Sequence, residues 1–163
     1  MIRILAVSLC AMAPLVQARE PTVEPTITSV VMEQFECFWG TCPNYIVAIN
    51  SDGSASYIGL SVAKKKGGVS LQLPPSAFDN VVNEIERINY FDLRESYVSE
   101  ADGCKELWSD QSSVSFFVTR GGKTKKVHLY YGCKLPKVTD NLSGLASMID
   151  AETGIAPLLG RGQ

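Results

Sequence analysis

The expected mature chain contains four cysteines that are candidates for disulfide, metal-binding or redox chemistry: Cys37, Cys42, Cys104 and Cys133. An even number of cysteines in an exported protein favours two disulfides, and four cysteines allow three pairings. We expect the pairs Cys37–Cys42 and Cys104–Cys133, of which the second closes the longer loop and contributes more stability. Zinc sites use pairs of closely spaced cysteines, and redox enzymes use C-x-x-C at a helix start; neither pattern is present. Structural disulfides are therefore favoured, with thiol–disulfide chemistry at Cys37 and Cys42 as the alternative.

Three large aromatic side chains are the candidate binding residues. Phe38 and Trp39 lie between the first two cysteines, and an aromatic pair on a disulfide-closed loop would be a preorganised anchor for a partner. The same rings could instead cap the core of a sheet, and the sequence leaves both interpretations open. Trp108 is the third candidate, because it lies in a long segment without periodicity over residues 92–111, and long loops in compact domains are often functional.

The only histidine, His128, lies on an alternating segment with Lys126 and Tyr130 on the same face. We expect it to be solvated rather than catalytic, since no serine or cysteine motif stands beside it. The chain has no G-x-S-x-G, no P-loop and no G-x-G-x-x-G, and the zincin motif needs two histidines. Serine hydrolase, nucleotide-binding and zincin functions are therefore excluded by motif, and we expect no cofactor.

Carboxylates in the 92–111 segment offer a weaker possibility. Asp102 with Glu106 or Asp110 could serve a glycosidase, but a retaining enzyme needs two carboxyl groups only about 5 Å apart, which spacing in the sequence does not establish. Calcium binding near Asp102 lacks the spacing of an EF-hand. A solvated acidic loop is favoured, and we expect no metal site.

Charge is nearly balanced, with 15 Lys and Arg against 17 Asp and Glu and a net charge of −2, which gives no support to nucleic-acid binding. Two lysine groups stand out: Lys64–Lys66, and the set of Lys123, Lys125 and Lys126. They would form one basic patch for an anionic envelope polymer if their hairpins adjoin. Solvated turn residues, or charges that protect sheet edges, are the favoured interpretation.

The N-terminus has the pattern of a secretory signal peptide over residues 1–18: a charge at Arg3, an apolar run, and a small-residue cleavage pattern ending at Ala18. The apolar run is too short for a permanent membrane span, and no other stretch approaches the roughly 20 residues that a span needs. We expect a periplasmic or secreted protein with no integral membrane span. An extended lead-in over residues 19–26 would follow the cleavage site.

Hydrophobic periodicity predicts one α+β domain over residues 27–150. Alternation and turn signals predict strands over residues 27–36, 45–50, 54–60, 69–73, 114–118 and 127–131. Amphipathic helices are predicted from Pro74 to near Asn89 and from Leu135 to Asp150. This order predicts an antiparallel sheet of about six strands with two helices packed on one face. Residues 151–163, rich in glycine, are expected to form a flexible tail.

The opening of this domain resembles a known family. The run from Cys37 to Tyr45, CFWGTCPNY, is followed by a strand, by Asp52-Gly53, and by Tyr57 and Gly59. It is similar to the C-x-G-x-C-P-x-Y opening of domain-of-unknown-function family 6438, and the likeness continues weakly through residues 91–93, Tyr97 and the Ile149-Asp150 end of the last helix. The cysteines here are one residue farther apart than in that pattern, with Trp39 as the apparent insertion. The resemblance covers residues 27–150, implies an exported bacterial protein, and brings no known activity.

Together these features favour an exported, non-catalytic binding module of the cell envelope, whose partner would be an envelope protein or polymer. An envelope thiol–disulfide protein using Cys37 and Cys42 is the alternative. A hydrolase acting through the carboxylates of the 92–111 segment comes third.

Overall fold

The computed structural model describes residues 26–35 and 37–160. The predicted signal peptide and nearly all of the predicted lead-in therefore lie outside the described residues. Within them, no helix is long and apolar enough to cross a membrane.

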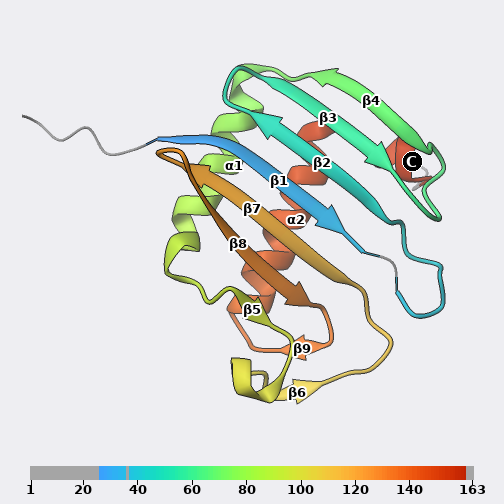
Figure 1. The fold of residues 1–163 in the computed structure, drawn as a ribbon, viewed down its shortest axis with the longest axis vertical. Helices are drawn as coiled ribbons and strands as arrows, with labels where there is room; N and C mark the ends of the chain where they lie inside the picture. Colours follow the sequence, from blue (N-terminus) through green and yellow to red (C-terminus); the bar gives the residue numbers. More distant parts are fainter. Residues whose placement is uncertain (1–25, 36, 161–163) are drawn as a thin grey trace, which may run out of the picture.

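A seven-stranded sheet forms one layer of the domain (Figure 1). Its strands, in spatial order, are β4 (Gly67–Gln72), β3 (Ser54–Gly59), β2 (Tyr45–Asn50), β1 (Ile27–Gln34), β7 (Ser113–Arg120), β8 (Lys123–Tyr130) and β5 (Ser96–Tyr97). Neighbouring strands are antiparallel except β5, which pairs with β8 in parallel. The central strand β1 joins a sequential β1–β4 meander to the β7–β8 hairpin, as expected where short turns connect consecutive strands.

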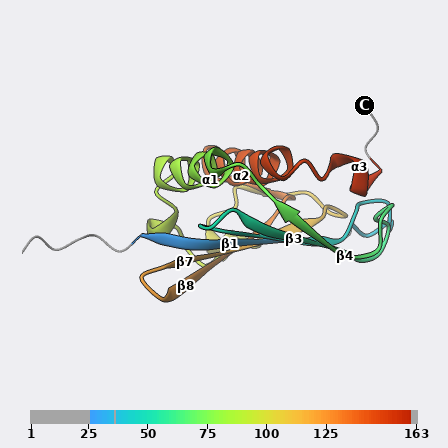
Figure 2. The same cartoon turned by 90° about the horizontal axis from the view of Figure 1, so that it is seen from above.

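Two long helices, α1 (Pro75–Arg87) and α2 (Val138–Thr153), cover one face of the sheet (Figure 2). Alternation along the strands produces this layer, because every second side chain points to the same face. The buried strand residues include Val30, Met32, Val47, Ile49, Phe116 and Leu129, and they pack with Val81 and Ile85 of α1 and with Leu142, Leu145 and Ile149 of α2. The predicted α+β class, with helices on one face of a largely antiparallel sheet, is confirmed.

The segment predicted to be irregular over residues 92–111 contains regular structure. Besides β5, it holds the 3-10 turn η2 (Glu100–Asp102) and β6 (Glu106–Leu107), and the turn η1 (Tyr90–Asp92) enters it. β6 pairs with β9 (Cys133–Lys134) in a separate two-stranded sheet. Two-residue strands are too short to show periodicity, so only tertiary pairing reveals them.

The last helix begins three residues later than predicted, and residues 151–160 of the predicted flexible tail contain helical structure, whereas residues 161–163 lie outside the described residues. α2 begins at Val138 because the hydroxyl of Thr139 accepts from the Leu135 amide at 3.1 Å and donates to the Cys133 carbonyl at 2.9 Å, which holds the preceding residues in a turn. Beyond Asp150 the chain continues in α2 to Thr153 and then in α3 (Ala156–Leu159). Apolar side chains fix this segment, since Ile155 and Leu159 are buried.

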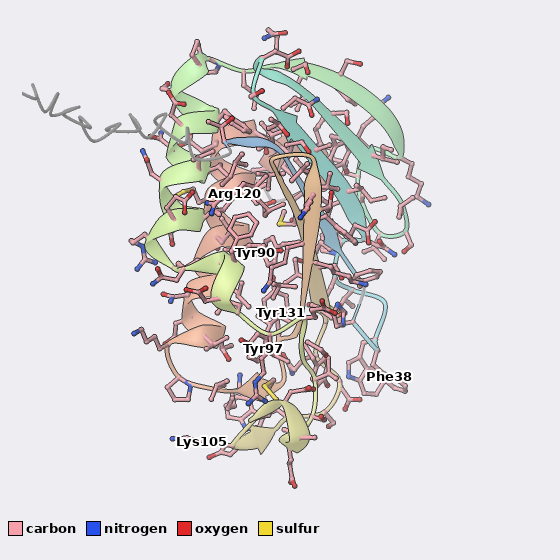
Figure 3. The ribbon with its side chains drawn as sticks, turned by 60° about the vertical axis from the view of Figure 1, so that its left-hand side comes forward. Phe38, Tyr90, Tyr97, Lys105, Arg120 and Tyr131 are labelled. Atoms are coloured by element: carbon pink, nitrogen blue, oxygen red, sulfur yellow. A yellow bond between two sulfur atoms is a disulfide. The ribbon has the colours of Figure 1, made fainter. Side chains whose placement is uncertain are left out.

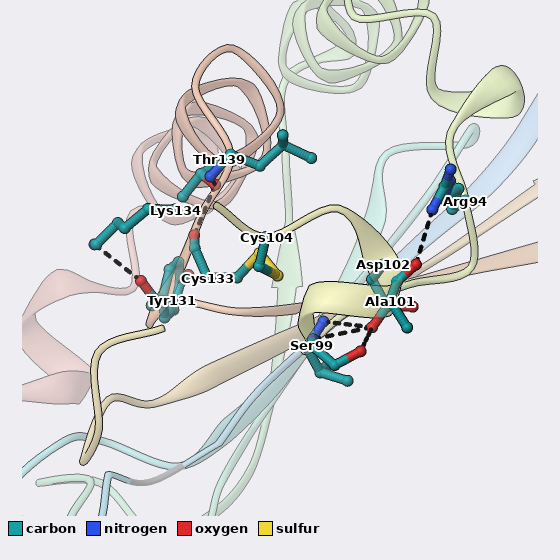
Figure 4. Close-up of a disulfide and its surroundings, with 11 residues drawn as sticks. Arg94, Ser99, Ala101, Asp102, Cys104, Tyr131, Cys133, Lys134 and Thr139 are labelled. Atoms are coloured by element: carbon teal, nitrogen blue, oxygen red, sulfur yellow. Dashed lines mark hydrogen bonds between the residues drawn. A yellow bond between two sulfur atoms is a disulfide. The ribbon is translucent and has the colours of Figure 1, made fainter. Parts of the chain in front are cut away.

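Both predicted disulfide pairs are present. Cys37–Cys42 closes the connection between β1 and β2, and Cys104–Cys133 joins the segment before β6 to β9 (Figure 4). The second disulfide fixes the otherwise long connection between α1 and β7 to the end of the sheet.

Candidate functional site

The connection between β1 and β2 presents two aromatic rings to solvent. Phe38 is 75% exposed and Trp39 is 73% exposed, and their ring centroids lie 5.3 Å apart at 86°, an edge-to-face pair. Figure 3 places Phe38 at the outer edge of the molecule. These rings therefore lie at the surface and do not cap the core.

Covalent and backbone constraints hold this connection, which we call the Cys37–Cys42 loop. The disulfide closes it, and the Gly40 amide donates to the Cys37 carbonyl at 2.9 Å in a turn. Gly40 has φ of +63°, a conformation that L side chains rarely adopt, so a glycine suits this position. The two exposed rings are thus carried on a constrained loop, which reduces the entropy lost when they bind a partner.

The register of the sheet places two further segments near this loop. Gln34, the last residue of β1, pairs with Tyr45 of β2 and with Val114 of β7. The Cys37–Cys42 loop and the segment leading into β7 therefore leave the sheet at the same end. Tyr131, which follows β8, also lies at this end, because its amide donates to the Ser112 carbonyl at 3.0 Å.

Trp108 belongs to the segment leading into β7 and is 56% exposed. Its ring nitrogen donates to Glu106 at 3.2 Å, and the Lys134 ammonium lies 4.2 Å from the ring centroid. Its backbone is fixed on both sides, by the Gly132 carbonyl at 2.9 Å and the Tyr130 hydroxyl at 2.8 Å. All three predicted binding residues therefore lie exposed at the same end of the sheet.

A pocket of about 400 Å³ lies at this end, between α2 and the start of β2. The pocket adjoins the Cys37–Cys42 loop, because part of its wall is formed by Cys42, the last residue of the loop, and by Pro43, which follows it. We call it the Asp150 pocket, because Asp150 is the one Asp, Glu, Lys, Arg or His among the described residues that line it. The Tyr45 hydroxyl donates to both carboxylate oxygens of Asp150, at 2.7 and 2.9 Å.

A second hydrogen-bond network, at Gln34, Ser112 and Tyr131, forms another part of the pocket wall. The Tyr131 hydroxyl donates to the side-chain oxygen of Gln34 at 3.1 Å, and the Gln34 amide nitrogen donates to the Ser113 carbonyl at 3.2 Å and the Ser112 hydroxyl at 3.4 Å. Gln34 is buried, so these bonds satisfy a polar group that would otherwise destabilise the interior. The wall is consequently a fixed polar surface.

This pocket is not among the sites predicted from the sequence. A signal for it exists, because Ser143, Ser147 and Asp150 recur at helical spacing beside the apolar stripe of α2. What the sequence does not show is that this polar stripe faces Tyr45, 105 residues away in the chain.

His128 is half-buried and bonded, which corrects the expectation of a solvated side chain. Its Nδ1 lies 2.8 Å from the Ser115 hydroxyl, and the ring of Phe35 packs edge-on at 6.0 Å. Burial, and then the positive charge of Lys126, lower the pKa of His128. Ser115 is buried, so its hydroxyl is not placed to attack a substrate.

The candidate carboxylates for hydrolysis are each engaged locally. Asp102 accepts from the amides of Val98 and Ser99 and from the Ser99 hydroxyl (Figure 4), and these bonds lower its pKa. Glu106 accepts from Trp108, and Asp110 from Ser109. Each of these three carboxylates thus binds residues close to it in the sequence, and the structure does not pair them as the acid and base of a hydrolase. Within the described part of the chain, no group of three or more His, Cys, Asp or Glu side chains is placed to hold a metal ion.

The two lysine groups do not form one basic patch. Lys64–Lys66 lies in the β3–β4 turn, at the end of the sheet where Gly59 pairs with Tyr45. Lys123 begins β8 at the opposite end of the sheet, where Arg120 pairs with Ile27. Lys125 is also bound internally, because its ammonium donates to the Phe91 and Leu93 carbonyls at 2.7 and 2.5 Å. The structure therefore contradicts a shared anionic-polymer site at these lysines.

Comparison with protein families finds one model, described as a domain of unknown function (DUF6438), that matches residues 28–151. The chain belongs to the DUF6438 family. The match covers nearly the whole described domain, and it agrees with the family expected from the Cys37–Tyr45 opening. No curated protein matches the chain. Four residues of that opening, Thr41, Cys42, Pro43 and Tyr45, line the Asp150 pocket.

Proposed function

We propose that this DUF6438 protein is an exported, non-catalytic binding module of the bacterial cell envelope, which contacts its partner through Phe38 and Trp39. The observation that carries the proposal is the exposure of both rings on a disulfide-closed loop. Buried aromatic anchors dominate the binding energy of protein interfaces, and constraint in the free state reduces the cost of association. Two disulfides are compatible with an oxidising compartment outside the cytoplasm.

Trp108 extends the same surface. Its ring is held by Glu106 and lies beside the Lys134 ammonium, so it is positioned before any partner arrives. An aromatic surface with one neighbouring cation and one neighbouring carboxylate suits an envelope protein or polymer that offers both apolar and polar groups.

The thiol–disulfide alternative has less support from the geometry. A catalytic thiol is activated by a helix N-terminus or by a neighbouring cation. Cys37 and Cys42 instead lie between two strands, and Cys37 is buried with its sulfur 3.4 Å from the Thr41 hydroxyl. We therefore assign the disulfide to constraining the loop.

The test compares what the immobilised protein and its variants capture from an envelope extract, with proteins identified by mass spectrometry and polymers by sugar analysis. We expect the double variant Phe38→Ala/Trp39→Ala to lose at least 90% of a captured partner, because two anchors are removed. Trp108→Ala should weaken capture less. The control is Val98→Ala, which truncates another exposed apolar side chain and should leave capture unchanged.

The double variant should also keep its melting temperature, since truncating exposed side chains changes stability by only about 0.5 kcal/mol. A captured set that is the same for the wild type and for Phe38→Ala/Trp39→Ala would contradict the proposal.

A further inference from the structure

The Asp150 pocket has the size of a small-molecule site. Its volume of about 400 Å³ lies within the range typical of ligand pockets, roughly 300–1,000 Å³. α2 forms one wall with Ser143, Ser147 and Asp150, while Thr41 and Tyr45 of the β1–β2 region form another. Rigid elements and a disulfide-closed loop thus surround it, which favours a preformed site.

The polar side-chain atoms of the lining are almost all oxygens. Among the described lining residues they belong to one carboxylate, two phenols and four aliphatic hydroxyls, and none of these residues is Lys, Arg or His. The one side-chain amide nitrogen, in Gln34, donates to Ser112 and Ser113. The proton of the Tyr131 hydroxyl goes to Gln34, and that of the Tyr45 hydroxyl goes to Asp150. The aliphatic hydroxyls can accept as well as donate, so the pocket offers acceptor atoms to a ligand that donates hydrogen bonds.

Its electrostatic character is negative for two separate reasons. Asp150 supplies a carboxylate, which has about four lone-pair sites and so accepts from a ligand as well as from the protein. Asp150 also lies in the last turn of α2, which ends at Thr153, and the C-terminal end of a helix carries partial negative charge that favours cations. Both contributions favour a positively charged ligand at the same place.

We propose that the Asp150 pocket binds a small molecule through a primary ammonium group, which donates to the Asp150 carboxylate and to neighbouring hydroxyl oxygens. The Tyr45 hydroxyl acts as a positioning group, because its bonds to both carboxylate oxygens fix the direction of Asp150. Small amines, including amino sugars, have this chemistry and fit the volume. This inference does not depend on the Phe38 and Trp39 proposal.

A bound metal ion is the other cation to consider. Divalent ions need several anionic or carbonyl oxygens, and the lining residues that the structure describes supply a single carboxylate. An ammonium group needs only acceptors arranged around its three N–H donors, and phenol, hydroxyl and carboxylate oxygens supply them.

The experiment titrates the oxidised mature protein with glucosamine and with N-acetylglucosamine, followed by amide chemical shifts in NMR. The two sugars differ in that acetylation removes the positive charge, so the comparison needs no variant protein. We expect saturable shifts around Thr41, Tyr45 and Asp150 with glucosamine, and binding of N-acetylglucosamine at least tenfold weaker, since hydrogen bonds to charged groups are among the strong ones. Ethanolamine, a simple amine, should compete with glucosamine.

Three variants separate the site from the fold. Asp150→Asn should weaken glucosamine binding about tenfold or more, whereas Asp140→Asn, an acid of the same helix outside the pocket, should leave it unchanged. Ser147→Leu should fill the mouth of the pocket and abolish binding, and Ser147 is exposed on a helix where leucine is well tolerated.

Several outcomes would overturn the proposal. One is equal binding of N-acetylglucosamine, which would mean recognition of hydroxyl groups. Another is no saturable shift with either amine, and a third is glucosamine shifts that persist in Ser147→Leu. Displacement of glucosamine by equimolar Ca²⁺ would instead assign the site to metal ions.

Discussion

Removing the two disulfides one at a time is expected to destabilise the protein by different amounts. Cys104–Cys133 spans 29 residues, and Cys37–Cys42 spans 5. A cross-link stabilises a fold mainly by restricting the unfolded chain, so the longer loop contributes more. The perturbation is the double substitution Cys104→Ala/Cys133→Ala, compared with Cys37→Ala/Cys42→Ala.

The loop-entropy relation gives the magnitudes. A 29-residue separation corresponds to about 3.6 kcal/mol at 25 °C, and a 5-residue separation to about 2 kcal/mol. Cys104 and Cys133 are both buried, so their truncation adds a small packing loss. For a domain of this size, loss of the longer disulfide should lower the melting temperature by about 10 °C.

The assay is urea unfolding followed by far-ultraviolet circular dichroism for the wild type and both double variants. Reduced wild-type protein is the control, because it loses the cross-links and keeps every side chain. Removing Cys104–Cys133 should also steepen the dependence on urea, since the released unfolded chain exposes more surface. A loss of stability for Cys37→Ala/Cys42→Ala that equals or exceeds that for Cys104→Ala/Cys133→Ala would refute the reasoning.

Three further predictions concern single residues. Gly59→Ala should lower the free energy of unfolding by about 2 kcal/mol or more, because the new Cβ would lie 1.9 Å from the Lys65 carbonyl oxygen. Gly68→Ala in the same hairpin is the control: its Cβ meets no atom within 4 Å, so it should leave the melting temperature nearly unchanged. Tyr90→Phe should lower the free energy of unfolding by about 1–2 kcal/mol in urea titrations, because its buried hydroxyl donates to a carbonyl of β7 at 2.9 Å and to one of β8 at 3.2 Å; an unchanged midpoint would contradict this. Because burial lowers the pKa of His128 from its ordinary 6.5, the unfolded chain takes up the proton first, and stability should fall as the pH drops from about 7.5 to about 5.5. His128→Gln should reduce that slope, and an identical slope in both proteins would show that His128 does not cause it.

The sheet and its helices could be predicted because their signals are local. Alternation in β1, β2, β7 and β8 marks the buried face, and the Asp52-Gly53 and Gly121-Gly122 turns mark the hairpins. The disulfide pairs followed from the strand ends that the turns define. Long amphipathic or alternating segments carry enough repeated information to fix both type and buried face.

The parts that could not be predicted depend on tertiary contacts. β5 and β6 are two residues each, and they exist because β8 and β9 lie beside them. The glycine-rich composition after Asp150 predicts flexibility, but Ile155 and Leu159 are buried against the rest of the domain. Local propensity cannot show that a neighbour is present to accept such residues.

The candidate site was predictable only where local sequence signals mark it. The cysteines mark a constrained loop, and Phe38 and Trp39 are evident as its aromatic residues, although the sequence does not show whether they face solvent. Ser143, Ser147 and Asp150 form a polar stripe whose position is set by the packing of α2, so the pocket is visible only in the folded chain.

The most direct test of whether this protein is a binding module or a thiol–disulfide enzyme is a redox titration of its cysteines. The oxidised protein would be equilibrated in a series of glutathione buffers, alkylated without reduction, and measured by intact mass. A binding module with structural disulfides should keep all four thiols blocked at envelope-like potentials of about −200 mV. Alkylation of Cys37 and Cys42 at a mild potential, with Cys104 and Cys133 still joined, would identify the first pair as a redox site and contradict the proposed function.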